Sequence, residues 1–200
     1  MKNKYIDSNN DIEANKLFCQ IPIVKIKRKD IYNKLKEEEY PHKVTNFWAK
    51  KQITLEEKHW TLPTLCTKET RLQTLQWKIL HNIFPTAILL HKMGIVNSIK
   101  CKKCNLTEFS EHFFFDCKAN KQLWEEVTNI INSKFAFCID LNLQTVMTGY
   151  FNKKLNKRNI LEINHVLLIA KMVISKSKYG KGRNMVTLLH EELNNRNIKT

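Results

Sequence analysis

Four potential metal ligands lie within one short segment, and they constrain the local fold more than any other feature of the chain. Cys101, Cys104, His112 and Cys117 follow the spacing C-x2-C-x7-H-x4-C. Three thiolates and one imidazole form a complete tetrahedral ligand set for Zn²⁺, and a complete set leaves no position open for a substrate. We therefore predict a structural zinc site within residues 99–117. The Cys-x-x-Cys step would form a tight turn, and His112 and Cys117 would lie on a following helical turn.

The six cysteines of the chain also admit a second interpretation, in which they form three disulfides. Disulfide frameworks are typical of secreted proteins, and the polar residues 1–10 contain no apolar core of a signal peptide. We therefore interpret the clustered Cys and His as metal ligands, and Cys19, Cys66 and Cys138 as spare thiols in the core. No apolar run reaches the roughly 18 residues of a membrane span, so we expect an intracellular protein of the nucleus or cytoplasm without membrane contact.

The residues around the zinc ligands resemble a known family. The segment LQWKILHNIFPTAILLHKMGI at 75–95 precedes the Cys-x-x-Cys step, Glu108 precedes EHFFFDC at 111–117, and Trp124 follows Cys117 by seven residues. This pattern is similar to the zinc-binding domain that follows the polymerase domain in the reverse transcriptases of LINE-type (non-LTR) retrotransposons. The resemblance extends over about Asp30 to Leu193 and is strongest between Leu62 and Trp124.

The resemblance implies a non-catalytic domain that holds template RNA near the polymerase, with RNA or DNA, and the reverse transcriptase core, as its partners. The residues agree with the absence of catalysis. The four glycines form no phosphate loop or dinucleotide fingerprint, and the five aspartates contain no adjacent pair like that of a polymerase metal site. We therefore expect a protein without catalytic residues and without a small-molecule substrate.

The charge of the chain favours a polyanionic partner, nucleic acid first. Lysine and arginine outnumber acidic residues by 34 to 19, and the net charge is +15. A Lys- and Asn-rich composition can also follow from coding bias, so charge alone does not establish the partner. The residues that we expect to contact nucleic acid are Lys100, Lys102 and Lys103 beside the zinc ligands, Arg71 and Lys78 on a central helix, and Lys176, Lys178, Lys181 and Arg183 in a basic connection.

Several of these features keep a second interpretation. The stripe that contains Arg71 and Lys78 is also what a solvated helix face looks like, and the basic segment 176–183 fits either a flexible strap on nucleic acid or a solvated connection. Phe113–Phe115 fit a small core beside the metal better than a base-stacking surface. The rival function is a structural or protein-interaction module whose zinc only completes the fold.

Hydrophobic spacing predicts an all-α fold, a helical domain with an embedded CCHC zinc knuckle. Residues 1–29 would form a variable, partly disordered segment, and residues 30–200 the helical zinc-binding domain. Leu72, Leu75, Ile79 and Ile83 recur on one face of a helix over 67–84, which Trp77, Leu80 and Phe84 would widen. The almost entirely apolar segment 159–175 predicts a buried helix in which His165 is a hydrogen-bonded core residue. Further helices are expected over 30–39, 44–52, 86–93, 118–133, 141–150 and 185–194, and the turns around Cys104 can accommodate a small hairpin.

Overall fold

The computed structural model describes residues 44–135, 138–179 and 183–198. The chain divides into two compact units, Met1–Lys51 and Gln52–Thr200. In the first unit the described residues include a short helix over 44–49, within the range 44–52 that the sequence predicts. The predicted helix over 30–39 and the boundary near residue 29 lie outside the described residues.

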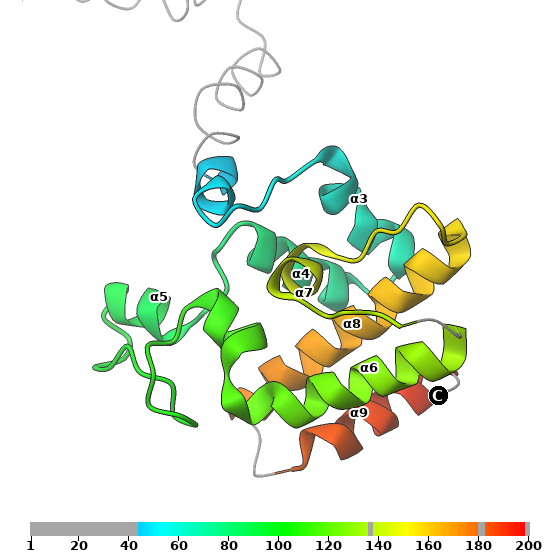
Figure 1. Ribbon diagram of the computed structural model, residues 1–200. Helices are drawn as coiled ribbons and strands as arrows, with labels where there is room; N and C mark the ends of the chain where they lie inside the picture. The colour runs from blue at the N-terminus through cyan, green and yellow to red at the C-terminus, as the bar shows by residue number, and fades with distance from the viewer. Residues whose placement is uncertain (1–43, 136–137, 180–182, 199–200) are drawn as a thin grey trace, which may run out of the picture. The chain divides into compact units, whose positions relative to one another are not determined.

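The second unit is built from helices, with a long connection between residues 93 and 111, and its described residues contain no strand (Figure 1). Its elements in chain order are α3 (Glu57–Cys66), α4 (Thr70–Leu80), α5 (Ala87–Lys92), the π-helix η2 (His112–Asp116), the 3₁₀-helix η3 (Lys118–Asn120), α6 (Lys121–Phe135), α7 (Leu143–Thr148), α8 (Lys157–Tyr179) and α9 (Met185–Asn194).

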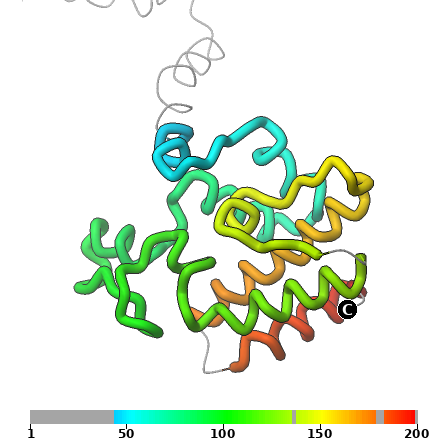
Figure 2. The backbone as a smooth tube through the Cα atoms, in the orientation of Figure 1, coloured from blue at the N-terminus to red at the C-terminus, as the bar shows by residue number. Residues whose placement is uncertain are grey.

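Helix α8 is the centre of this unit and contacts α3, α4, α6 and α9 (Figures 1 and 2). Its side chains are apolar on nearly every side, and Ile163 and Ile169 are fully buried. On α4, Leu72 and Ile79 are also fully buried. Burying one such side chain contributes about 1.5–3 kcal/mol, so these two helices supply much of the core. The predicted central pair of helices is confirmed.

Helix α4 is shorter and its apolar face narrower than the sequence predicts. The helix ends at Leu80, and the backbone of Asn82 then adopts a left-handed conformation with φ 52°. Ile83, predicted on the buried face, lies beyond the end of the helix and is 43% exposed, and Trp77, predicted to widen that face, is 46% exposed. Gln76 is buried in its place, because its Nε2 donates a hydrogen bond to the carbonyl oxygen of Met147 at 2.7 Å.

Helix α8 is longer than predicted, which changes the interpretation of the basic segment after it. The helix runs to Tyr179, so Lys176 and Lys178 lie on its last turns and not in a flexible strap. Lys176 forms an ion pair with Glu192 of α9. Lys181 lies outside the described residues, and Arg183 is exposed just before α9. The described part of the predicted strap is therefore mostly regular helix.

Two further predictions about single residues need correction. The Nε2 atom of His165 is buried without a hydrogen-bond partner in the described part of the chain, so this histidine is not fully satisfied. Burial lowers its pKa and favours the neutral ring. Cys138 is exposed, whereas Cys66 is half-buried. Only Cys66 of these two spare thiols thus resembles a core residue, and Cys19 lies outside the described residues.

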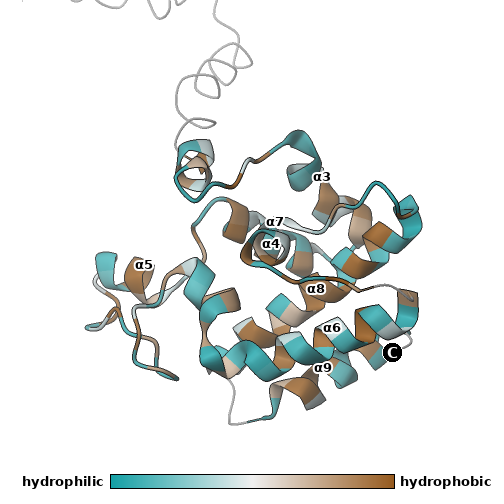
Figure 3. Cartoon of the chain, in the orientation of Figure 1, coloured by the Kyte–Doolittle hydropathy of each residue, from teal (hydrophilic) through white to brown (hydrophobic). Residues whose placement is uncertain are grey.

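Helix α5 and the loops around it extend to one side of the helices packed on α8 (Figure 1). The Thr86 hydroxyl caps α5 by accepting a hydrogen bond from the backbone of Leu89, and Gly94, with φ 71°, follows its C-terminus as predicted. This arm exposes apolar side chains, among them Met93 and Ile95, and appears partly brown in Figure 3. Of the helices that the structure describes, none has the length and apolar character needed to cross a bilayer.

Candidate metal centre and surrounding basic surface

The first two candidate ligands lie on a hairpin-like turn. The backbone N–H of Cys101 donates to the carbonyl of Leu106 at 2.7 Å, and Lys100 and Thr107 form an isolated antiparallel bridge. Asn105 closes the turn with φ 62°, a left-handed conformation in which Asn is enriched among non-glycine residues. The small hairpin that the sequence accommodates is therefore present as one bridge, and it turns Cys101 and Cys104 toward the same point.

The other two ligands flank a π-helical turn. In η2 the backbone N–H of Cys117 donates to the carbonyl of His112 at 3.0 Å, a hydrogen bond that spans five residues. The same five-residue step separates the two ligands, so the wider turn keeps both on one side, whereas the α-helical period of 3.6 residues would rotate them apart. The predicted helical turn is thus confirmed, in a form that suits the His-x4-Cys spacing.

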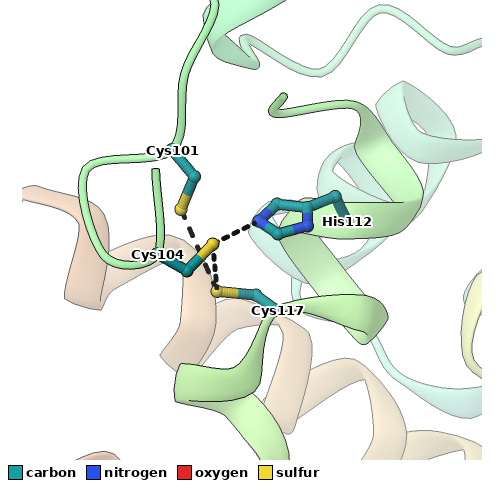
Figure 4. Close-up of side chains that lie close together, drawn as sticks. All are labelled: Cys101, Cys104, His112 and Cys117. Atoms are coloured by element: carbon teal, nitrogen blue, oxygen red, sulfur yellow. Dashed lines mark hydrogen bonds between the residues drawn. The ribbon is translucent and has the colours of Figure 1, made fainter. Parts of the chain in front are cut away.

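The four ligand atoms form a compact cluster (Figure 4). All of them lie within 4.8 Å of one another. The sulfur of Cys117 is 3.9 Å from those of Cys101 and Cys104, and the Cys104 sulfur is 3.1 Å from His112 Nε2. A tetrahedron with Zn–S bonds of about 2.3 Å has sulfur atoms roughly 3.8 Å apart. The donor set and its spacing therefore fit one Zn²⁺, which the four predicted ligands would hold.

The electrostatic surroundings of the thiols differ. A backbone hydrogen bond from Leu106 lowers the pKa of Cys104, with smaller contributions from the neighbouring thiols. Burial raises the pKa of Cys117 to about 12. A thiol with so high a pKa becomes a thiolate at neutral pH only beside a cation, and a coordinated metal supplies that cation. Cys117 is consequently unsuited to act as a free reactive cysteine.

Two side chains from the following elements stabilise the π-helix. Carbonyl groups of a wide turn are left without helical partners, and here the Asn120 side chain donates to the carbonyl of Phe113 at 2.8 Å. The indole N–H of Trp124 donates to the carbonyl of Phe114, also at 2.8 Å. Both side chains are buried. The hydrogen bond of Trp124 explains why the sequence pattern includes a Trp seven residues after Cys117, because this Trp fixes the turn that carries His112 and Cys117.

Glu108 connects the metal segment to two helices. Its Oε1 atom accepts hydrogen bonds from the backbone N–H of Ala87, at 2.8 Å, and from the ammonium of Lys178, at 2.7 Å. The Lys178 ammonium also donates to the Pro85 carbonyl at 3.0 Å and lies 4.9 Å from the ring centre of Phe113. Glu108 is 4% exposed, so this is a buried ion pair. Lys178 is therefore a structural residue and is removed from the predicted nucleic-acid contacts.

The phenylalanines of the metal segment form a small core. Phe113 and Phe114 are buried, and their rings lie 4.8 Å apart in an edge-on arrangement. Phe84, from the loop after α4, packs against both at 5.0 and 4.7 Å. The interpretation of this run as a mini-core is confirmed for these two residues, and neither is available to stack on a base.

The remaining predicted contact residues that the structure describes lie on the metal-binding turn and along two clefts. Lys100 and Lys102 are exposed on the metal-binding turn, and no carboxylate in the described part of the chain pairs with either. Lys103, also exposed, donates to the Ser177 hydroxyl at 3.0 Å. Arg71 and Lys78 are exposed on α4 and line a cleft of about 620 Å³ between α4 and α8, which Lys176 also lines. Lys176 also lines a second cleft, beside α9, together with Lys103 and Arg183.

Comparison with known proteins agrees with this centre. Residues 27–124 match a family model described as zinc-binding in reverse transcriptase. The match contains all four ligands, Glu108 and Trp124, so over these residues the chain is similar to a zinc-binding domain, and Zn²⁺ is the metal for its Cys/His cluster. The predicted resemblance to a reverse transcriptase zinc-binding domain is confirmed over residues 27–124. No curated protein and no solved structure gives a match.

Proposed function

We propose that this chain carries the zinc-binding domain of a LINE-type retrotransposon reverse transcriptase and that the domain binds the backbone of RNA or DNA without catalysing a reaction. The bound Zn²⁺ would complete a CCHC knuckle and hold its turn in one conformation. In this proposal the domain keeps template nucleic acid near the polymerase core. Because the ligand set has no open position, the metal has a structural role.

The observation that carries this proposal is the position of Lys100 and Lys102. They flank the ligand Cys101 on both sides, they are exposed, and no described carboxylate neutralises them. A metal bound to Cys101 would hold the backbone on both sides of it in one conformation. Lys100 and Lys102 would then lose less conformational entropy when they bind phosphates than lysines on a mobile loop do. With a net charge of +15 the chain also attracts polyanions over long distances.

The rival proposal is a structural or protein-interaction module whose zinc serves the fold alone. Exposed apolar residues after α5 and on the metal-binding turn, such as Met93 and Leu106, favour this interaction module. The two functions differ in their response to salt, because each phosphate contact releases counterions and makes affinity fall with salt concentration, whereas an apolar contact does not.

The test is a salt titration of RNA and DNA binding by wild type and by the charge reversal Lys100→Glu/Lys102→Glu. We expect the reversal to weaken binding similarly for all sequences and to reduce the slope of log affinity against log salt by about 2, one per lost phosphate contact. Zinc content and the melting curve should remain unchanged, because exposed charges contribute little to stability.

The matched control is Lys153→Glu/Lys154→Glu, which makes the same charge change at two exposed lysines in the loop between α7 and α8. If net charge alone governs binding, both double variants lose affinity equally. If wild-type binding is weak and indifferent to salt and to the Lys100/Lys102 reversal, the nucleic-acid function is wrong and the interaction-module function is favoured.

A further inference from the structure

The solvent-facing side of α4 lies between two hollows. On one side is the 620 Å³ cleft lined by Arg71 and Lys78. On the other is a smaller cleft of about 210 Å³, lined by Trp60 and Trp77. Thr74 lines both clefts, so it marks the ridge between them. One helix face therefore carries a cationic strip and, directly beside it, an aromatic one.

Trp77 is the large residue of this face, and it is fixed in place. Its side chain is 46% exposed, yet its ring lies 4.3 Å from that of His81 at an angle of 46°. His81 in turn packs against Trp60 at 5.1 Å. Burial lowers the pKa of His81, so the middle ring is neutral at pH 7 and adds no charge to the stack. The contacts among the three rings restrict the motion of the indole, while nearly half of Trp77 stays exposed.

Arg71 and Lys78 supply free positive charge beside this ring. Both are exposed, and no ion pair to either occurs in the described ranges. Seven residues separate them, which corresponds to about 10 Å along the helix. The third cation of the cleft, Lys176, is already paired with Glu192. The two α4 residues are thus the cations of this cleft that a phosphate meets without displacing a carboxylate.

We propose that this face of α4 binds single-stranded nucleic acid, with a base stacked on Trp77 and the backbone held by Arg71 and Lys78. The inference rests on the proposed nucleic-acid function. It adds a second contact surface, which should prefer single strands to duplexes. A duplex conceals the faces of its bases within the stack, whereas an unpaired base offers a face to an aromatic ring. Cations beside an exposed aromatic ring are the combination with which proteins bind single strands irrespective of sequence.

The chain provides its own optical probe for this contact. Of its four tryptophans, Trp48 and Trp124 are buried, Trp60 is half-buried, and Trp77 is the most exposed. A base stacked on Trp77 should quench its fluorescence. We expect a single-stranded oligouridine to quench the emission of the zinc-loaded full chain, and an RNA duplex of equal length to quench it much less. In Trp77→Phe the quenching by oligouridine should be almost lost.

Affinity measurements on three variants test the contact independently of fluorescence. Trp77→Ala should weaken oligouridine binding about tenfold, because stacking of one base is worth on the order of a tenfold change or more. Trp77→Phe keeps a ring and should stay within about threefold of wild type. The matched control Leu65→Ala, which truncates an exposed apolar residue on the neighbouring α3, should bind like wild type. Zinc content and melting temperature verify that each variant is folded.

The outcomes separate this inference from the proposed function. If Trp77→Ala binds single strands like wild type, while binding still falls with salt and with the Lys100/Lys102 reversal, the α4 site is wrong and the proposed function stands. Equal affinity for duplex and single strand would also overturn the α4 site. If wild type binds neither RNA nor DNA, both are wrong, and capture of a protein by this face would then support the interaction module.

Discussion

At the scale of single residues, the zinc ligands are the part of the site that follows most directly from the sequence. Cysteine and histidine at a set spacing are chemically specific, and the structure brings together all four that were predicted. The cationic residues were less predictable, because lysine is common on every surface. Lys178 shows why: only the tertiary contact with Glu108 reveals that its charge is used inside the protein.

Substitution of a ligand tests the centre at this scale. Cys104→Ser should lose zinc and unfold the turn over 100–107, which depends on the metal, whereas Phe113 and Phe114 keep their own core. We expect a zinc content of roughly one tenth of wild type or less and a clearly lower melting temperature. The control Cys138→Ser changes an exposed thiol outside the cluster and should be neutral. Zinc loss in the control, or a wild-type melting curve in Cys104→Ser, would show that the ligands are misassigned.

At the scale of elements, hydrophobic spacing predicts which segments are helical better than it predicts where they end. Helix α9 was predicted with its observed bounds, Met185–Asn194. Helix α8 continues four residues beyond its predicted end, because Lys176 and Lys178 find acidic partners on other elements. The π-helix could not be predicted, since its stability depends on side chains that arrive from η3 and α6.

The dependence of the π-helix on α6 can be measured with Trp124→Phe. This change keeps a buried ring but removes the N–H that bonds the Phe114 carbonyl, which is then buried without a partner. We expect a loss of about 1–3 kcal/mol of stability. A fall in zinc affinity of roughly tenfold should accompany it, because supporting contacts around a metal have effects of that size.

The control for this change is Trp77→Phe, which removes an exposed indole N–H for which no hydrogen bond is seen in the described part of the chain. It should leave stability within about 0.5 kcal/mol of wild type, as surface substitutions do. If the two variants have equal zinc affinity, the Trp124 hydrogen bond does not support the ligands.

At the scale of the whole molecule, the predicted all-α class and the central pair α4 and α8 are confirmed, but the chemistry between these helices was not foreseen. In the sequence Lys171 only interrupts an apolar segment. In the structure it is 1% exposed, and its ammonium donates to Gln76 Oε1 at 2.5 Å and to the Val146 carbonyl at 2.9 Å. One lysine thus joins α8, α4 and α7, an arrangement that depends on residues 25 and 95 positions away.

This buried lysine should make the stability of the molecule depend on pH. Burial lowers the pKa of Lys171 from 10.5 to about 7, and the nearby Cys66, whose own pKa is raised to about 12, stays neutral and does not compensate. Between about pH 7 and 10.5 the unfolded chain binds more protons at this site than the folded chain. The free energy of unfolding therefore increases with pH between about pH 7 and 10.5, by up to about 1.4 kcal/mol per pH unit. Below about pH 7 Lys171 is charged in both states, and the folded protein carries the full cost of burying that charge.

The measurement is urea unfolding of the zinc-loaded protein at pH 7, 8 and 9, for wild type and for Lys171→Met. The variant lacks the titrating group but keeps a long apolar side chain, so wild type should gain stability relative to it as the pH rises. Thiol ionisation in the unfolded state affects both proteins equally and cancels in the difference. Parallel curves for the two proteins would show that Lys171 has an ordinary pKa and that its ammonium reaches solvent.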